Sequence, residues 1–372
     1  MILRLFMGGF RRTFLPAIVK KEIRSEQSHE ESIVVENFPE GETESLTVDE
    51  KLQVNSIWGT HNNSFKELEL FKKQRGFDAR YLSHYLYLPI ISHKLNNYHY
   101  TKLFEHKSLQ GYIVRGLLKS PYCYVRCIDK EYYDNNMNQI SRQQAIDNCL
   151  RQNCLIVKDS VDSSGGKSVE KLVLEEIKEK QKEIERVFKE RCHDFVIQEC
   201  IKQHPSLARF NETSINTFRV TTLYLNGKFS VLSIVLRIGK QGMKVDNWGA
   251  GGIIIGVSPT GQINEYGYDI KLNKFHNYNG ITYKDEIIEQ IPSLLEKIED
   301  AHKNQFSLCK FIGWDICFNQ SNEPIIIELN SSQPGIIGEQ LCTGPIFGDR
   351  TQEVINYCQS KAFIYNKALF KY

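Results

Sequence analysis

The chain has 372 residues, of which 41% are hydrophobic and 25% are charged, and its formal net charge is +2. This length exceeds what one small core can use and suits two or three packed subdomains, and the composition is ordinary for a globular protein. A charge so close to zero provides no field that would attract a polyanion, so we expect no nucleic-acid partner.

The first hundred residues divide into three stretches. Residues 1–24 mix apolar and basic side chains, and the arginines interrupt any signal-peptide core. Such a segment either rests on the anionic inner face of a membrane or packs as a helix on its own domain. Residues 25–50 are acidic and poor in aromatic side chains, which is typical of a linker, whereas residues 51–101 are aromatic and helical in character.

The next hundred residues change to a pattern of strands. We expect a small α/β subdomain over 102–153 and a second lobe over 154–202. In that lobe, short apolar runs predict strands at 155–158 and 195–201. Between them, apolar residues spaced three and four apart predict a helix over about 174–191, with its charged residues on a solvated face.

A polar loop with paired glycines follows Lys158 at the end of the first of these strands. Small residues here allow successive backbone N–H groups to surround phosphate oxygens, and Lys158 adds charge to the same anion. The loop is not a P-loop, because Val161 occupies the position of the first glycine and a strand follows instead of a helix. A plain surface hairpin is the alternative interpretation.

A single carboxylate, Glu199, interrupts the apolar strand at 195–201. It either faces a purine edge, together with neighbouring backbone groups, or lies in water on an edge strand.

An Asn-Gly turn predicts a hairpin over 216–238, with Arg219 and Arg237 on its two arms. Arginine is costly to bury unpaired, so each should face an anionic ligand or a carboxylate in a structural salt bridge. Beyond the hairpin, Asp246 and Asn247 form either a substrate lip or a turn closed by side-chain bonding.

After a helix predicted over about 284–303, two apolar runs at 311–318 and 324–330 predict a hairpin, and the last residues, 350–372, are helical in pattern. If the two runs pair, Asp315, Glu328 and Asn330 can share one face of the sheet. Three hard oxygen donors are what Mg²⁺ requires beside substrate phosphates, although two solvent-facing carboxylates would look the same in sequence.

The ten cysteines show no Cys-x-x-Cys pair and no Cys/His cluster at zinc spacing. We expect reduced core thiols and a cytoplasmic location.

This succession of motifs resembles the ATP-grasp superfamily. The segments 216–221, 237–239, 245–253 and 313–315 look more narrowly like the sugar-transfer-associated ATP-grasp family, which is related to α-L-glutamate ligases. The resemblance covers roughly residues 102–349. It implies an α+β fold in which two α+β lobes clasp ATP, with an N-terminal helical extension and a C-terminal lobe over 203–349 that carries the magnesium site.

The resemblance also implies roles for individual residues, and every one of them is an expectation. The ATP-binding set is Lys107, Lys158, Ser163, Ser164, Gly165, Gly166, Glu199, Cys200 and Ile201. The metal set is Asp315, Glu328 and Asn330, the catalytic arginines are Arg219 and Arg237, and the substrate set is Asn216, Asp246 and Asn247.

The implied reaction is ATP- and Mg²⁺-dependent ligation of a carboxylate to an amine through an acyl phosphate, in cell-surface polysaccharide biosynthesis. Two alternatives stay open on the same scaffold. One is a kinase of a sugar or polyol hydroxyl, and the other is a non-catalytic nucleotide-binding partner of a glycosyltransferase.

Overall fold

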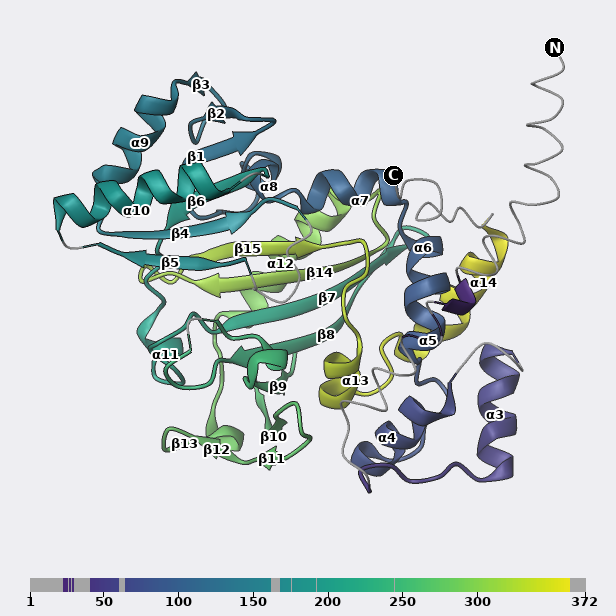
Figure 1. Cartoon of the computed structure of the whole chain (residues 1–372). Coiled ribbons are helices and arrows are strands. Elements are labelled where there is room, and N and C mark those ends of the chain that lie inside the picture. Colours follow the sequence, from purple (N-terminus) through teal and green to yellow (C-terminus); the bar gives the residue numbers. More distant parts are fainter. Residues whose placement is uncertain are drawn as a thin grey trace, which may run out of the picture. The chain divides into compact units, whose positions relative to one another are not determined.

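The computed structural model describes residues 23–25, 27, 29, 41–59, 64–161, 168–174, 176–191, 193–243 and 245–361. These residues fall into two compact units, one from Met1–Tyr98 with Ser332–Tyr372 and the other from His99–Ser331 (Figure 1). Helices and strands are both abundant, which confirms the predicted α+β class. None of the helices in the described ranges is long and apolar enough to cross a membrane.

The first unit is helical where it is described. A capping box begins its first long helix, because Thr47 Oγ1 accepts from Glu50 N at 3.2 Å and Glu50 Oε2 accepts from Thr47 N at 2.7 Å. The elements are α3 (Val48–Trp58), α4 (Phe65–Arg75), α5 (His84–Leu86), a π-helical turn (Tyr87–Ile91), α6 (Ser92–Leu95), α13 (Ile337–Thr343), η4 (Gly348–Arg350) and α14 (Thr351–Ser360).

The C-terminal part of the chain joins this unit through Gln340. Its Oε1 accepts from Leu82 N at 3.0 Å and its Nε2 donates to Leu82 O at 2.8 Å. Residues 332–349 therefore group with the N-terminal helices, whereas the sequence prediction placed them with 203–331. The difference arises because one buried amide satisfies the backbone of a segment about 260 residues away, which no local pattern reveals.

The second unit begins with α7 (Tyr98–Glu105), which starts at the boundary, and α8 (Lys107–Ile113), followed by an antiparallel six-stranded sheet. Helices α9 (Arg142–Leu150) and α10 (Ile177–Glu190) share a hydrophobic core with this sheet (Figure 1). In spatial order the strands are β3 (Gln139–Ile140), β2 (Glu131–Tyr133), β1 (Cys123–Ile128), β6 (Phe195–Glu199), β4 (Cys154–Asp159) and β5 (Glu170–Val173).

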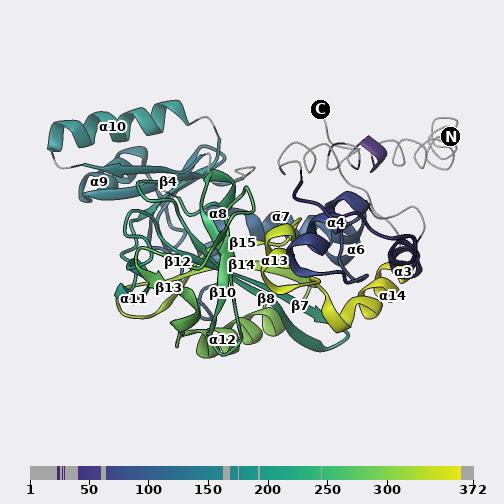
Figure 2. The same ribbon diagram turned by 90° about the horizontal axis from the view of Figure 1, so that it is seen from below.

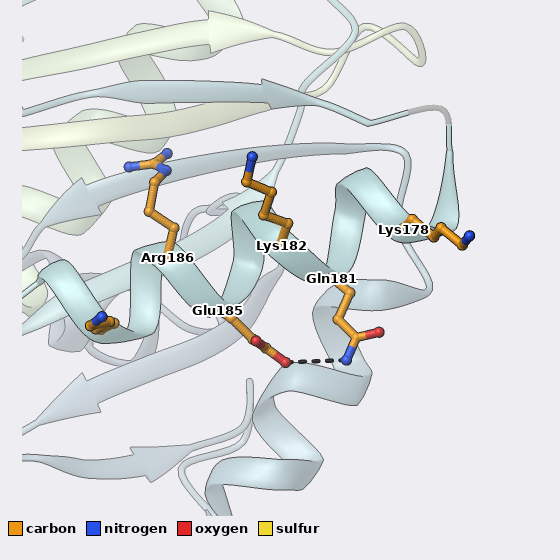
Figure 3. A pocket seen from close by; sticks show the side chains of 6 residues that line it. Lys178, Gln181, Lys182, Glu185 and Arg186 are labelled. Atoms are coloured by element: carbon orange, nitrogen blue, oxygen red, sulfur yellow. Dashed lines mark hydrogen bonds between the residues drawn. The ribbon is translucent and has the colours of Figure 1, made fainter.

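The outer face of α10 is the solvated face that the sequence predicts. A hollow of about 430 Å³ there is lined only by side chains of the helix itself. Figure 3 shows Lys178, Lys182 and Arg186 along it, with Gln181 Nε2 donating to Glu185 Oε1 at 3.2 Å. One charged helix surface without a second wall is no ligand site.

The same unit contains a seven-stranded antiparallel sheet whose apolar face packs on α12 (Ile291–Asn304), as Figure 2 shows. Its strands are, in spatial order, β11 (Lys274–Phe275), β10 (Ile263–Tyr268), β9 (Ile253–Val257), β8 (Lys228–Ile238), β7 (Thr217–Leu225), β14 (Phe311–Phe318) and β15 (Pro324–Asn330). Shorter elements are α11 (Pro205–Ala208), η2 (Trp248–Ala250), η3 (Tyr283–Asp285) and the pair β12 (Asn277–Tyr278) and β13 (Ile281–Thr282).

Two of the predicted helices are longer than the observed ones. The helix expected from 284 begins at Ile291, because Pro292 is tolerated only in a first turn, and 283–285 form a separate 3-10 turn. The helix expected from 174 begins at Ile177. By contrast, both predicted hairpins are confirmed within one residue.

A buried hydrogen-bonded chain joins α12 to the large sheet. Trp314 Nε1 donates to Thr222 Oγ1, which lies 2.8 Å from His302 Nδ1, and His302 Nε2 lies 2.8 Å from the Cys309 carbonyl. Because the carbonyl can only accept, His302 Nε2 carries a proton. Burial lowers the pKa of His302 to about 4, against the weaker opposing effect of the Cys309 carbonyl.

Strand alternation separates the two faces of this sheet. Phe218, Leu236, Trp314 and Leu329 belong to the core against α12. Their neighbours in sequence therefore project from the opposite face, and these neighbours are the charged residues of the candidate site.

Candidate functional site

Asp315, near the middle of β14, is the centre of the site. It is 5% exposed, and its carboxylate faces two arginines, one from the adjacent strand β7 and one from β8, the next strand beyond it. Arg219 Nε lies 2.5 Å from Asp315 Oδ1 and Arg219 Nη2 lies 2.9 Å from Oδ2, while Arg237 Nη1 lies 3.3 Å from Oδ2. Burial alone would raise the pKa of Asp315, but the charges of Arg219 and Arg237 outweigh it and hold this pKa below its usual value.

The other two predicted metal ligands lie on β15 beside Asp315. Glu328 is the cross-strand partner of Asp315, and Asn330 Nδ2 donates to Asp315 Oδ2 at 3.3 Å. A register shift between Asp315 and Ile316 lets the strands keep pairing beyond this point. The three side chains therefore share one face, as the sequence predicts.

Lys107 reaches this group from the first turn of α8. Its Nζ lies 2.8 Å from Glu328 Oε1, and the residue is 9% exposed. Its backbone N–H donates to the Ser160 carbonyl at 2.9 Å, which fixes the start of α8 next to the end of β4. The structure thus brings Lys107 to the predicted metal ligands, although 221 residues separate it from Glu328.

Lys158, on β4, is the next of the predicted ATP-binding residues. In the described part of the chain its ammonium forms no hydrogen bond and no ion pair. Burial lowers the pKa of Lys158, and the charge of Lys107 adds to this effect, while Glu328 opposes it. Lys158 is thus a half-buried lysine that lies close enough to Lys107 for their charges to oppose each other.

The substrate set divides into one residue at the site and two with local roles. Asp246 Oδ2 accepts from Thr217 N at 2.9 Å and also from the Thr217 hydroxyl, and burial raises the pKa of Asp246 even though Arg237 opposes it. Asn247 Oδ1 accepts from Gly249 N at 3.2 Å, which is the predicted closed turn. Asn216 is fully buried, and its Nδ2 donates to Gln203, Leu207 and Asn211.

Glu199 ends β6, which lies between β1 and β4 inside the smaller sheet and not at its edge, and the Glu199 side chain is held by backbone. Its Oε1 accepts from Tyr122 N at 2.7 Å, and its own N–H donates to the Tyr122 carbonyl at 2.9 Å. Ile201 follows in irregular backbone and is half-buried. Ser163, Ser164, Gly165 and Gly166, the predicted phosphate loop, lie outside the described residues, as do residues 1–22 of the basic N-terminal segment.

Cys200 corrects the expectation that all cysteines are reduced thiols. It is bonded to Cys154, with the two Cα atoms 5.7 Å apart. The pairing of Leu155 with Glu199 places these cysteines opposite each other at the ends of β4 and β6. Seven other cysteines in the described ranges form no disulfide and are buried, as expected. Spacing could not reveal the bond, because 46 residues separate its two ends.

The donor set fits the predicted magnesium ion. Two carboxylates and an amide, from Asp315, Glu328 and Asn330, supply hard oxygen atoms on one face. Within the described residues there is no group of three or more His, Cys, Asp or Glu side chains that could hold a metal ion. Magnesium sites that bind nucleotides are typically completed by oxygen atoms of water and of substrate phosphates.

Sequence reasoning did not find two contacts of this site and one buried hydrogen-bond donor. Thr217 holds Asp246, Tyr122 holds Glu199, and the indole N–H of Trp248 is buried without a partner among the described residues. The only signal for Trp248 was its position next to Asp246 and Asn247.

Comparison with known proteins gives one family match. A family model described as sugar-transfer-associated ATP-grasp matches residues 91–356. No curated protein sequence matches the chain.

Solved structures with similar folds include D-alanyl-alanine synthetase A from Vibrio cholerae, with 11% identity over 68% of this chain and 64% of that one and a TM-score of 0.41. An L-amino acid ligase from Bacillus licheniformis has 14% identity over 70% and 49% of the two chains and a TM-score of 0.38. The present chain thus spans less than two thirds of either. Likeness at this level is no evidence of a shared activity or substrate.

Proposed function

Because the chain belongs to the sugar-transfer-associated ATP-grasp family, matched over residues 91–356, we propose that it is an ATP-dependent ligase that joins a carboxylate to an amine. Family membership confirms the predicted ATP-grasp fold. The observation that supports the activity best is the charged face of the large sheet. There, Asp315, Glu328 and Asn330 lie together with Arg237 and Lys107.

This face has the charges that phosphoryl transfer needs. Lys158 carries no fixed counter-charge among the described residues, so it is available to a nucleotide phosphate, and Lys107 adds a second positive charge beside Glu328. Asp315, Glu328 and Asn330 would hold Mg²⁺. When bound, the ion neutralises phosphate charge and orients the nucleotide tail.

The two arginines would act differently. Arg219 makes two bonds to Asp315 and is buried, so it positions that carboxylate, which matches the structural salt bridge considered from the sequence. Arg237 makes one longer contact, at 3.3 Å, and is more exposed. Arg237 is therefore the better placed of the two to turn toward a transferring phosphoryl group and stabilise its charge.

In the proposed reaction a substrate carboxylate oxygen bonds to the γ-phosphorus while the bond to the β,γ-bridging oxygen breaks, which releases ADP and leaves an acyl phosphate. The amine nitrogen then bonds to the acyl carbon, phosphate leaves, and the nitrogen loses a proton. We propose that the acceptor is a precursor of a cell-surface polysaccharide, since the family is associated with sugar transfer.

The test is ADP release by the full chain with ATP, Mg²⁺ and panels of carboxylates and amines. We expect release only when both substrates are present, and trapping with hydroxylamine should give a hydroxamate because acyl phosphates react with it. Turnover with hydroxyl acceptors, giving a phosphorylated product stable to hydroxylamine, would identify a kinase instead. Absence of turnover together with retained nucleotide binding would favour the non-catalytic partner.

A pair of variants links any activity to this site. Asp315→Asn keeps the shape of the side chain and removes the charge, so we expect it to lose ADP release. The matched control is Asp300→Asn, which removes a carboxylate from the exposed side of α12 and should keep full activity.

A further inference from the structure

A second hollow lies in the large-sheet unit, at the end where the loop after β8 meets the turn between β10 and β11. It has a volume of about 520 Å³. We call it the Lys240 groove, and the residues that matter for its chemistry are Lys240, Gln241, Lys271, Asn273, Phe275 and Tyr278. Unlike the hollow on α10, its walls come from separate segments of the chain.

The groove is suited to an anion. Lys240 and Lys271 are both exposed, and in the described ranges neither ammonium has a hydrogen bond or an ion pair. One carboxylate, Asp269, also lines the groove, but its oxygens already accept from Lys271 N at 2.9 Å, Asn273 N at 2.9 Å and Asn273 Nδ2 at 2.8 Å. Asp269 therefore shapes the turn, and its one negative charge in the lining is outnumbered by the positive charges of the two lysines.

The groove also offers surfaces for a sugar ring. Phe275 and Tyr278 are half-buried rings on its wall, and Tyr278 is fixed because its hydroxyl oxygen accepts from Gln241 N at 3.1 Å. Gln241 and Asn273 also line the groove and are exposed residues, although Asn273 Nδ2 already donates to Asp269 Oδ2. Apolar ring faces with a few polar groups around them bind flat, hydroxylated ligands.

The groove begins close to the charged site. Lys240 is three residues beyond Arg237, so their Cα atoms are at most about 11 Å apart. Arg237 Nη1 itself lies 3.3 Å from Asp315 Oδ2. The loop that starts at Lys240 also carries Asp246, which bonds to Thr217 next to the arginines. A ligand of a few sugar units in the groove could therefore extend toward Asp315.

We propose that the Lys240 groove binds an acidic saccharide unit, with the sugar ring against Phe275 and Tyr278 and its anionic group on Lys240 and Lys271. The groove can bind a saccharide whether or not the protein is a ligase. Its role as the subsite that holds the acceptor substrate rests on the proposed ligase activity. The anionic group is a carboxylate, as in a uronic acid, or a phosphate ester, and the experiment separates these two.

The experiment is calorimetric titration of the full chain, with and without ADP and Mg²⁺, using three probes. These are a trimer of galacturonic acid, a neutral maltotriose and a hexose 6-phosphate. The test variant is Lys240→Gln/Lys271→Gln. The matched control, Lys284→Gln/Lys297→Gln, removes two exposed lysines from η3 and α12 and so changes the net charge equally.

We expect the wild type to bind at least one acidic probe and to bind it more tightly than the neutral trimer. The test variant should weaken that binding roughly tenfold, because two partly exposed charge contacts are lost, and the control should not. Phe275→Ala should weaken it as well. Preference for the uronate trimer identifies a carboxylate ligand, and preference for the hexose phosphate identifies a phosphate.

Three results would overturn the proposal: no binding of either acidic probe, equal binding of the neutral trimer, or the same loss in the control as in the test variant. The outcome is separable from that for the ligase. Saccharide binding without ADP release counts against the ligase alone, and ADP release without saccharide binding counts against the groove alone.

Discussion

The Cys154–Cys200 bond gives a prediction whose size follows from the structure. The bond closes a loop with a sequence separation of 46 residues. In the chain-entropy treatment, a cross-link over this length removes enough freedom from the unfolded chain to stabilise the fold by about 4 kcal/mol at 25 °C. Because it joins the ends of β4 and β6, the stabilised region is the six-stranded sheet that carries Lys158 and Glu199.

Urea denaturation of the full chain, followed by fluorescence, should measure this effect in oxidised protein, in protein treated with a dithiol, and in Cys154→Ser/Cys200→Ser. We expect both the reduced wild type and the double variant to unfold at lower urea concentration than the oxidised wild type. Cys127→Ala, which changes a free thiol on neighbouring β1, is the control and should keep its response to the dithiol. Non-reducing peptide mapping should recover residues 154 and 200 in one linked species.

The reasoning would be refuted by a double variant that still responds to the dithiol, or by reduced wild type as stable as the oxidised form. The first result would mean that another pair of thiols is cross-linked. The second would mean that strand pairing between β4 and β6 already restricts the unfolded chain, so that the cross-link adds nothing.

Three further predictions concern charge. Asp315→Asn leaves the charge of Arg219 buried without its carboxylate partner. Urea denaturation should therefore show a free energy of unfolding that is lower by roughly 3–5 kcal/mol. Calorimetry should show loss of Mg²⁺-dependent ADP binding. Lys158→Met removes an ammonium that has no ion pair in the described chain. Thermal melting should therefore show equal or higher stability, while ADP binding should weaken about tenfold or more. A large drop in stability would contradict this. The pKa of His302 in the folded state is about 4, below its ordinary value of 6.5. Between pH 4 and pH 6.5 the unfolded chain therefore binds more protons than the folded protein, so the free energy of unfolding should fall as the pH drops from 6.5 to 4. Urea titrations across this range should show up to about 3 kcal/mol of loss, and His302→Gln should reduce the slope.

Much of the local structure could be predicted from the sequence. Two apolar runs joined by a polar turn predicted the hairpin of β14 and β15, and the two-residue period of a strand predicted the face shared by Asp315, Glu328 and Asn330. The Asn-Gly turn fixed the hairpin that carries Arg219 and Arg237. These features depend on contacts between residues close in sequence, where the period of a strand and the geometry of a turn leave few alternatives. The order of the motifs then identified the family.

Only the tertiary structure determined which residues from distant segments of the chain come into contact. Three kinds of contact join segments that are far apart in the chain. They are the ion pair of Lys107 with Glu328, the disulfide between Cys154 and Cys200, and the unequal contacts that Arg219 and Arg237 make with Asp315. A sequence pattern shows which side of a strand is polar, but it does not specify the partner. The partner is set by sheet order and by the packing of whole elements, which depend on the core as a whole.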